Sequence, residues 1–300
     1  MAWGGAHMIG AAVIHRPSDT AGVADVVRSA AAADRALRIR GAGTWMDAGL
    51  PVRAGETLDL SALGGIDRYT PDDLTISAGA AVTLAELDEV TRAHNQWCPL
   101  LPWGDDAGSV GATIATATSG PFAGSLGRPR DLVIGLECVD GLGRVIRAGG
   151  RVVKNVAGFD LTRLMTGQWG TLGVITAVHL RLRARPAVDE SFTVSGGAED
   201  DSAMRAFAAG PHAPMACMPW PGGWLVRLGG NRASVDAAVA ALRRCGEVVQ
   251  VDDGVWNAVR RDSAPPPRAN VWKWDALSQR LKKRFDPAQV LNRGLLGEAS

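Results

Sequence analysis

The sequence predicts an α+β protein in two parts, each of which mixes helices and strands. At about 150 residues per domain, a chain of 300 residues favours two domains. Up to residue 186 the hydrophobic pattern changes between helical and strand periods, and after it the elements follow the order β-α-β-β-α-β. Arg185-Pro186 and a following acidic segment mark the boundary. We expect a first domain over 1–186, a small cap domain over 187–264, and a linker, helix and tail over 265–300 that return to the first domain.

The first domain opens with a helix and continues with short strands. From Thr20 to Asp34 apolar residues recur at helical spacing, after a polar stretch at 18–20 that can cap the helix. Thr83 and Glu86 have the spacing of a capping box, which predicts a helix to about Arg92. Strands are predicted over 36–40, 56–60, 74–78 and 174–182, and on both sides of the hairpin signal Asp140-Gly141 within 134–147.

The order of elements in the second part is typical of the ferredoxin-like arrangement. Helices are predicted over 202–209 and from Ser234, as the capping residue, through Ala241. Strands are predicted near 191–194, 215–218, 224–228 and 247–251. Pro265-Pro266-Pro267 predicts a stiff linker, and 275–285 a final helix.

Charge and cysteine content exclude several classes of function. With 32 basic and 31 acidic residues the formal charge is +1, which argues against a nucleic-acid partner. The four cysteines are far apart and form no CxxC pair, which argues against zinc ribbons, iron–sulfur clusters and a disulfide scaffold. These features favour a reducing cytoplasm. The N-terminal sequence has no Lys or Arg before Arg16 and a short apolar run, so we expect neither a signal peptide nor direct membrane insertion.

Three glycine-rich segments stand out in the first domain. The turn at 40–44 follows a strand and can direct backbone N–H groups toward a phosphate, although a plain tight turn has the same composition. The run at 108–120 contains only small and hydroxyl residues apart from Val110 and Ile114, which suits either a closely approaching ligand or a tightly packed helix. A third segment at 167–175 leads into a strand. Together they suggest an extended ligand wrapped by loops. Met46 breaks the Rossmann fingerprint, and no Walker pattern is present.

These and further motifs carry a resemblance to a known family. Segments 40–44, 108–112 and 127–135 resemble the FAD-binding (PCMH-type) domain of the vanillyl-alcohol oxidase superfamily. Segments 149–164 and 170–175 resemble the flavin subunits of bacterial glycolate oxidase, with the shorter E subunit as the nearer match. The ending at 285–294 is similar to the C-terminal motif of that group. The resemblance is dense over 20–186, thin over 187–275, and returns at the tail.

The resemblance implies noncovalent FAD, because the first loop has Trp45 and Met46 and lacks the histidine of the covalent members. It places the first loop and Ser109–Gly111 on the pyrophosphate, and the Gly173-Val174 backbone at the isoalloxazine or adenine end. Arg130 and Asp131 support the flavin in this interpretation, or else pair with neighbouring loops. The implied cofactor-binding residues are Arg40, Gly41, Ala42, Gly43, Thr44, Gly108, Ser109, Gly111, Ala112, Thr113, Ser119, Arg130, Asp131, Gly173 and Val174.

Residues for substrate chemistry are less evident. Trp169 stands where the larger catalytic subunit of the group has glutamate, and Phe159 replaces a tyrosine. His212 is the one histidine after residue 186, and its Pro-rich loop predicts that it is exposed to solvent. Because a metal site needs three or four ligands, no metal site is expected. Arg227 and Arg260 are possible carboxylate anchors or ordinary surface residues. The sequence assigns no catalytic base.

By resemblance, the expected function is an FAD-dependent oxidoreductase that oxidises a 2-hydroxy acid such as glycolate by hydride transfer to the flavin. Expected partners are a larger flavin subunit and an iron–sulfur subunit. The alternative is a flavin-holding or non-catalytic partner subunit of such an oxidase, which the small cap of about 80 residues favours. A stand-alone flavin dehydrogenase or reductase with another substrate is a third hypothesis.

Overall fold

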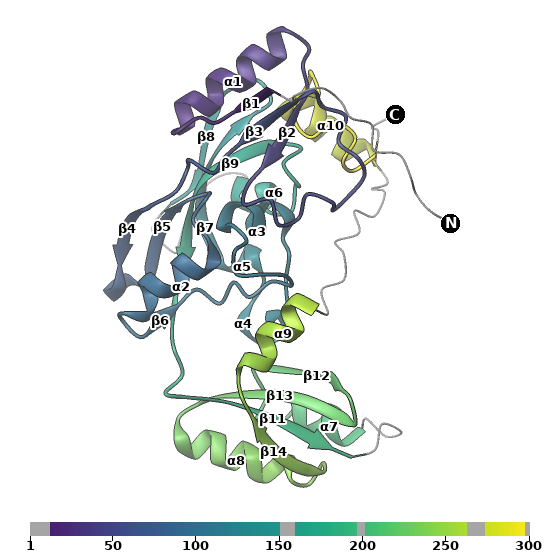
Figure 1. Ribbon diagram of the computed structural model, residues 1–300. Coiled ribbons are helices and arrows are strands. Elements are labelled where there is room, and N and C mark those ends of the chain that lie inside the picture. Colours follow the sequence, from purple (N-terminus) through teal and green to yellow (C-terminus); the bar gives the residue numbers. More distant parts are fainter. Residues whose placement is uncertain (1–12, 151–159, 197–201, 263–273, 298–300) are drawn as a thin grey trace.

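The computed structural model describes residues 13–150, 160–196, 202–262 and 274–297. Figure 1 shows two bodies, one built on two sheets and a smaller one built on a single sheet. The predicted α+β class is confirmed. The Pro265-Pro266-Pro267 linker and the middle of the 149–164 motif, with Phe159, lie outside the described residues.

The first sheet of the large body is parallel, in the order β1-β3-β2. The buried face of α1 packs on this sheet, against Leu37 and Leu58, and on the second sheet, against Val139 and Val174. Asp19 caps α1, as the sequence predicts, by accepting from the Gly22 N–H. The elements are β1 (Val13–His15), α1 (Thr20–Ala32), β2 (Leu37–Arg40) and β3 (Glu56–Asp59).

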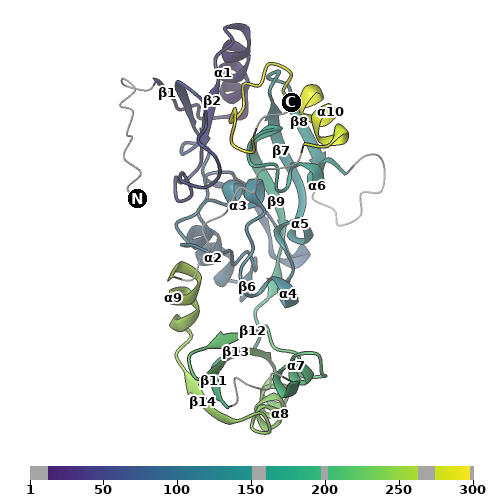
Figure 2. The same cartoon turned by 90° about the vertical axis from the view of Figure 1, so that its right-hand side faces the viewer.

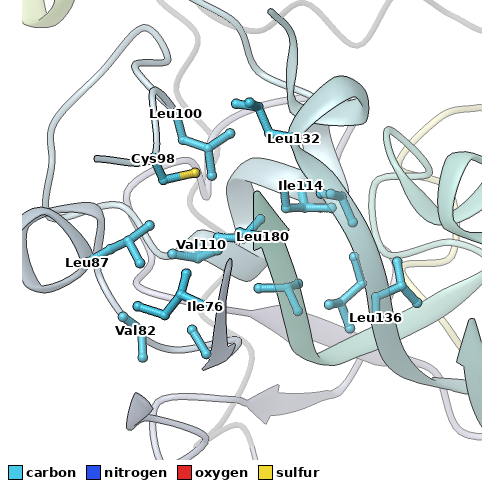
Figure 3. Close-up of a cluster of buried hydrophobic side chains, with 14 of the residues drawn as sticks. Ile76, Val82, Leu87, Cys98, Leu100, Val110, Ile114, Leu132, Leu136 and Leu180 are labelled. Atoms are coloured by element: carbon cyan, nitrogen blue, oxygen red, sulfur yellow. The ribbon is translucent and has the colours of Figure 1, made fainter. Parts of the chain in front are cut away.

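The second sheet is antiparallel, in the order β4-β5-β9-β7-β8. Figure 3 shows its core, in which Ile76, Leu136 and Leu180 of the sheet meet Val110 and Ile114 of α3. The strands are β4 (Ile66–Thr70), β5 (Thr75–Gly79), β7 (Val133–Asp140), β8 (Val145–Gly149) and β9 (Gly173–Arg181).

Short helices and one small ribbon accompany this sheet. The capping box predicted at the start of α2 is confirmed, since the Thr83 and Glu86 side chains each accept from the other residue's N–H. The ribbon pairs β6 (Gln96–Trp97) with β10 (Arg183–Ala184). The helices are α2 (Leu84–Arg92), α3 (Val110–Thr116), α4 (Ala123–Leu126), α5 (Pro129–Leu132) and α6 (Leu161–Met165), with a 3-10 turn at Pro71–Asp73.

The small body has the predicted ferredoxin-like fold. Its four antiparallel strands lie in the order β12-β13-β11-β14, and α7 and α8 cover one face of the sheet (Figures 1 and 2). One detail of the prediction was wrong: Asn231, not Ser234, caps α8, because the helix begins at the earlier of the two capping residues. The elements are β11 (Val188–Ser195), α7 (Ser202–Ala208), β12 (Ala216–Trp220), β13 (Gly223–Gly230), α8 (Arg232–Leu242) and β14 (Glu247–Val251).

Helix α9 (Gly254–Asp262) joins the two bodies. Trp256 is 1% exposed, donates to the Ser191 hydroxyl of the cap at 2.9 Å, and packs against Phe122 of the large body with ring centroids 5.1 Å apart. Arg260 donates to the Pro102 carbonyl oxygen at 2.8 Å. The cap is therefore seated on the large body through a mixed apolar and polar contact.

The chain then returns to the top of the large body with α10 (Ala276–Phe285), which Asp275 caps. The tail pairs with β2: the Leu37 N–H donates to the Val290 carbonyl at 2.7 Å, and Leu37 and Leu291 form a parallel bridge. The tail is thus part of the first sheet's edge.

Candidate functional site

A cleft of about 850 Å³ opens between β2 with its following loop, α3, and the start of β9. All three glycine-rich segments reach it, and two tail residues, Asn292 and Leu295, complete its wall. The predicted residues that line this cleft are Gly41, Gly43, Thr44, Ser109, Gly111, Ala112, Gly173 and Val174. The structure thus brings together residues that are up to 133 positions apart in the sequence, from Gly41 to Val174.

Other predicted residues lie outside the cleft lining. Arg40 turns toward Asp59, and Ala42 is an exposed residue of the same loop. Gly108 and Thr113 border a small adjoining hollow. Ser119 lines a separate hollow of about 220 Å³.

Arg130 and Asp131 are exposed on α5. The Asp131 carboxylate accepts from the Arg128 N–H at 2.9 Å and caps this short helix, and the nearest Arg130–Asp131 contact is 3.8 Å. The contacts that the structure shows for this pair are therefore local to α5 and its N-terminal cap.

Glycine is favoured at three positions of the cleft, for a different steric reason at each. Gly43 has φ +81°, which favours glycine, and a Cβ there would have no neighbour closer than 3.9 Å. A Cβ on Gly41 would lie 2.7 Å from the Ser109 hydroxyl oxygen, so the loop and α3 meet closely. A Cβ on Gly111 would lie 2.6 Å from the Ala80 Cβ, so this glycine serves the packing of α3 on the sheet.

The loop above β2 presents unpaired donors to the cleft. Among the described residues, the N–H groups of Ala42, Gly43 and Thr44 donate to no acceptor, and the Thr44 hydroxyl has no partner. Ser109 is 1% exposed, and its hydroxyl oxygen accepts from the Ala112 N–H at 3.4 Å. Consecutive free N–H groups beside a glycine of positive φ form a concavity suited to an anion. The loop residues and the small-residue floor therefore fit a dinucleotide diphosphate.

Asp59 anchors the base of this loop. It is 2% exposed and accepts from Arg40 at 2.6 Å, from Arg16 at 2.9 Å and from the Ser61 N–H at 3.0 Å. Burial alone would raise the pKa of Asp59, but these hydrogen bonds outweigh it and hold the pKa well below its usual value of 3.8. Arg40 thus positions the loop through this carboxylate.

This lowered pKa predicts a pH dependence of stability. Because the folded pKa lies below the unfolded value, the contribution of Asp59 is complete above about pH 4 and is lost as the pH falls further, at up to about 1.4 kcal/mol per pH unit. Urea unfolding of the wild type at pH 5, 4 and 3 should show this loss, and Asp59→Asn should flatten it. Asp25→Asn, an exposed carboxylate on α1, controls for removal of one negative charge. Equal pH slopes for the wild type and Asp59→Asn would contradict the prediction.

The opposite wall of the cleft is the turn from Gln168 to Gly173. The buried Gln168 amide accepts from the Leu172 N–H and donates to the Gly173 carbonyl, each at 2.8 Å. Trp169 has φ +59°, a left-handed backbone that is uncommon for a large residue. Trp169 lines the cleft, as do Arg38 of β2 and Met46 of the loop that follows it, and the motifs indicated none of these three residues as part of the site.

Neither candidate carboxylate anchor reaches the cleft. Arg227 makes a bidentate contact with Asp189 at 2.6 and 2.7 Å, and Arg260 is 2% exposed with Pro102 and Asp106 as partners. His212 is half-buried at a hollow between α7 and α8. No residue of the cap's described part lines the cleft.

In the part of the chain that the structure describes, no group of three His, Cys, Asp or Glu could hold a metal ion, and no helix is long and apolar enough to cross a membrane. All four cysteines are free. Burial raises the pKa of the Cys98 and Cys138 thiols to about 12, so both are unreactive at neutral pH.

Comparison with known proteins agrees with this geometry. Residues 11–149 match the family described as FAD binding domain. Glycolate oxidase subunit GlcE of Escherichia coli is 37% identical over 152 residues, which are 50% of this chain and 43% of that protein. D-lactate dehydrogenase of Archaeoglobus fulgidus is 33% identical over 171 residues, 57% of this chain and 38% of that protein. The matched part spans less than half the length of these relatives.

A solved structure shows the same fold. Alkyldihydroxyacetonephosphate synthase superposes with a TM-score of 0.67 at 15% identity, covering 83% of this chain and 54% of that one. The family match lies on the parallel sheet, the loop at 40–44 and α3, which build most of the cleft. Residues 11–149 are therefore similar to the FAD binding domain family, the cofactor that the cleft holds is FAD, and the chain's sequence is similar to that of glycolate oxidase subunit GlcE.

Proposed function

We propose that this chain is an FAD-dependent oxidoreductase component that oxidises a 2-hydroxy acid such as glycolate. The observation that carries the proposal is the cleft itself, where three glycine-rich segments and unpaired N–H groups meet inside an FAD-binding domain. Glycolate oxidase subunits and D-lactate dehydrogenases among the relatives support the substrate class.

The chain's own residues have separable roles in this proposal. The N–H groups of 42–44 and the hydroxyls of Thr44 and Ser109 hold the pyrophosphate, while Gly41 lets the loop lie close to α3 and Gly111 lets α3 pack on the sheet. Gly173 and Val174 contact the ring systems from the opposite wall. Arg40 acts through Asp59 on the loop. Bound FAD would supply the two-electron acceptor for oxidation of the substrate at its α-carbon, a reaction that also releases the hydroxyl proton.

A second candidate is a flavin-holding subunit that supports a catalytic partner. It is favoured by the pairing of Arg227 with Asp189 and of Arg260 with Asp106, which leaves neither guanidinium for a substrate carboxylate. In both versions we include a larger flavin subunit and an iron–sulfur subunit as partners. A cytoplasmic location belongs to the same proposal, supported by the four free cysteines.

The experiment is a visible spectrum of the purified chain, followed by heat release and chromatographic identification of the flavin. We expect one FAD per chain. A colourless chain that takes up no added FAD would contradict the proposal.

Substrate tests then separate the two versions. Anaerobic bleaching of the flavin by glycolate or D-lactate in the isolated chain supports direct catalysis. Bleaching only after the larger flavin subunit is added supports the flavin-holding version, and no bleaching in either case contradicts both.

A further inference from the structure

The C-terminal segment at 286–297 reaches the FAD cleft from a position far along the chain. Besides the Leu37–Val290 hydrogen bond, the Asn292 N–H donates to the Leu37 carbonyl at 3.0 Å. These contacts place the segment along β2, at the edge of the parallel sheet. The tail lies beside β2 in both views (Figures 1 and 2).

The side chain of Asn292 connects the two walls of the cleft. Its Oδ1 accepts from the Ile39 N–H at 2.8 Å, and its Nδ2 donates to the Trp169 carbonyl at 2.9 Å. Asn292 is 7% exposed and lines the cleft, so these hydrogen bonds are sheltered from bulk water. One amide thus ties the sheet that carries the 40–44 loop to the turn that begins β9.

Lys282 of α10 holds the same turn at a second point. Its ammonium donates to the Thr171 carbonyl at 2.8 Å and pairs with Asp286 at 2.6 Å. Helix α10 and the C-terminal segment together therefore fix the carbonyls of both Thr171 and Trp169. The turn needs such support, because Trp169 has a left-handed backbone that costs of order 1 kcal/mol in a residue other than glycine.

From these contacts we propose that Asn292 is a positioning residue of the FAD cleft, and that FAD and the docked C-terminal segment stabilise each other. A ligand that fits the cleft only when the turn is in place binds the tail-docked state more tightly. By linkage it must then favour tail docking to the same degree. The proposal rests on the proposed function only in requiring that this cleft holds FAD.

The sharpest test is Asn292→Asp. The carboxylate keeps the acceptor for the Ile39 N–H but loses the donor to the Trp169 carbonyl, and Asn and Asp both tolerate the φ of +45° at this position. We expect FAD, titrated into the apoprotein, to bind about tenfold more weakly. The flavin's visible band should also shift, since the Trp169 wall moves.

Gln289→Ala is the matched control. Gln289 is the other non-glycine residue of the described tail with a left-handed backbone, at φ +51°, but its side chain is exposed and does not line the cleft. FAD affinity should stay within about twofold of the wild type. Equal weakening by both substitutions would overturn the positioning role and indicate general loosening of the tail.

Proteolysis measures the reciprocal effect, which is the stabilisation of the docked C-terminal segment by FAD. Trypsin can cut after the exposed Lys283 and Arg284 once α10 opens, and we expect added FAD to slow this cleavage in the wild type. The protection should shrink in Asn292→Asp. Cleavage of the wild type that FAD leaves unchanged would overturn the proposal, even if the variant is too unstable to titrate.

The two levels of failure are distinct. If the wild type binds FAD and Asn292→Asp binds it equally well, this proposal fails and the proposed function stands. If the wild type binds no FAD, the proposed function fails and this proposal falls with it.

Discussion

Replacing Asp286 by asparagine is expected to lower the free energy of unfolding by about 3–5 kcal/mol. Asp286 has no exposed surface, and its two oxygens accept from the N–H groups of Val290 and Leu291 and from the Lys282 ammonium. All of these partners are donors, so the amide NH₂ of asparagine would face a donor whichever way it turned. The substitution would also leave the Lys282 ammonium buried without its counterion. Burial lowers the pKa of this lysine, and Asp286 is the group that opposes this effect.

Urea unfolding at neutral pH measures this effect, and Asp275→Asn is its control. Asp275 is exposed at the start of α10 and caps the helix by accepting from the Ser278 N–H at 2.7 Å. Since asparagine caps as well as aspartate, this variant should change stability by less than about 0.5 kcal/mol. A cost below about 1 kcal/mol for Asp286→Asn would mean that the buried pair contributes little beyond neutral packing.

The elements that the sequence predicted well are those with local signals. Thr83 and Glu86 define the start of α2 within four residues, and the valine-rich composition of β14 needs only its own five positions. In the cap, the predicted order β-α-β-β-α-β was enough to predict a ferredoxin-like sheet. The N-cap of α8 was misplaced because Asn231 and Ser234 are both good capping residues, and only the backbone distinguishes them.

The site was predictable only where its residues form a run. The glycines and hydroxyl residues at 40–44 and 108–112 indicated a ligand site, and these two segments form two sides of the cleft. Asn292, by contrast, accepts a hydrogen bond from Ile39, which is 253 residues away in the sequence. No property of the tail sequence alone indicates this contact. Arg130 and Asp131 are the opposite case. They form a charged pair inside a recognised motif, but the contacts that the structure shows for them are local to α5.

The 40–44 loop offers the largest expected effect on the cofactor, at Gly43. Gly43→Asp should weaken FAD binding at least about a hundredfold, while the chain stays folded. The position lines the cleft, and a Cβ there has open space, so a carboxylate would stand beside the pyrophosphate without a steric clash. Two like charges a few ångströms apart near a protein surface repel by about 3–4 kcal/mol, which exceeds two powers of ten in affinity.

Gly43→Asn isolates the charge from every other consequence of the substitution. Asparagine has nearly the same size as aspartate, and both tolerate positive φ better than other non-glycine residues, so the strain at φ +81° is shared. The difference in FAD affinity between the two variants is therefore electrostatic, and it should shrink as salt is raised from about 0.01 M to 1 M. Equal affinities for Gly43→Asp and Gly43→Asn would place the pyrophosphate away from this loop. The same pair at Gly111 would not separate the effects, because a Cβ there meets Ala80 at 2.6 Å and disturbs the packing of α3 whatever its charge.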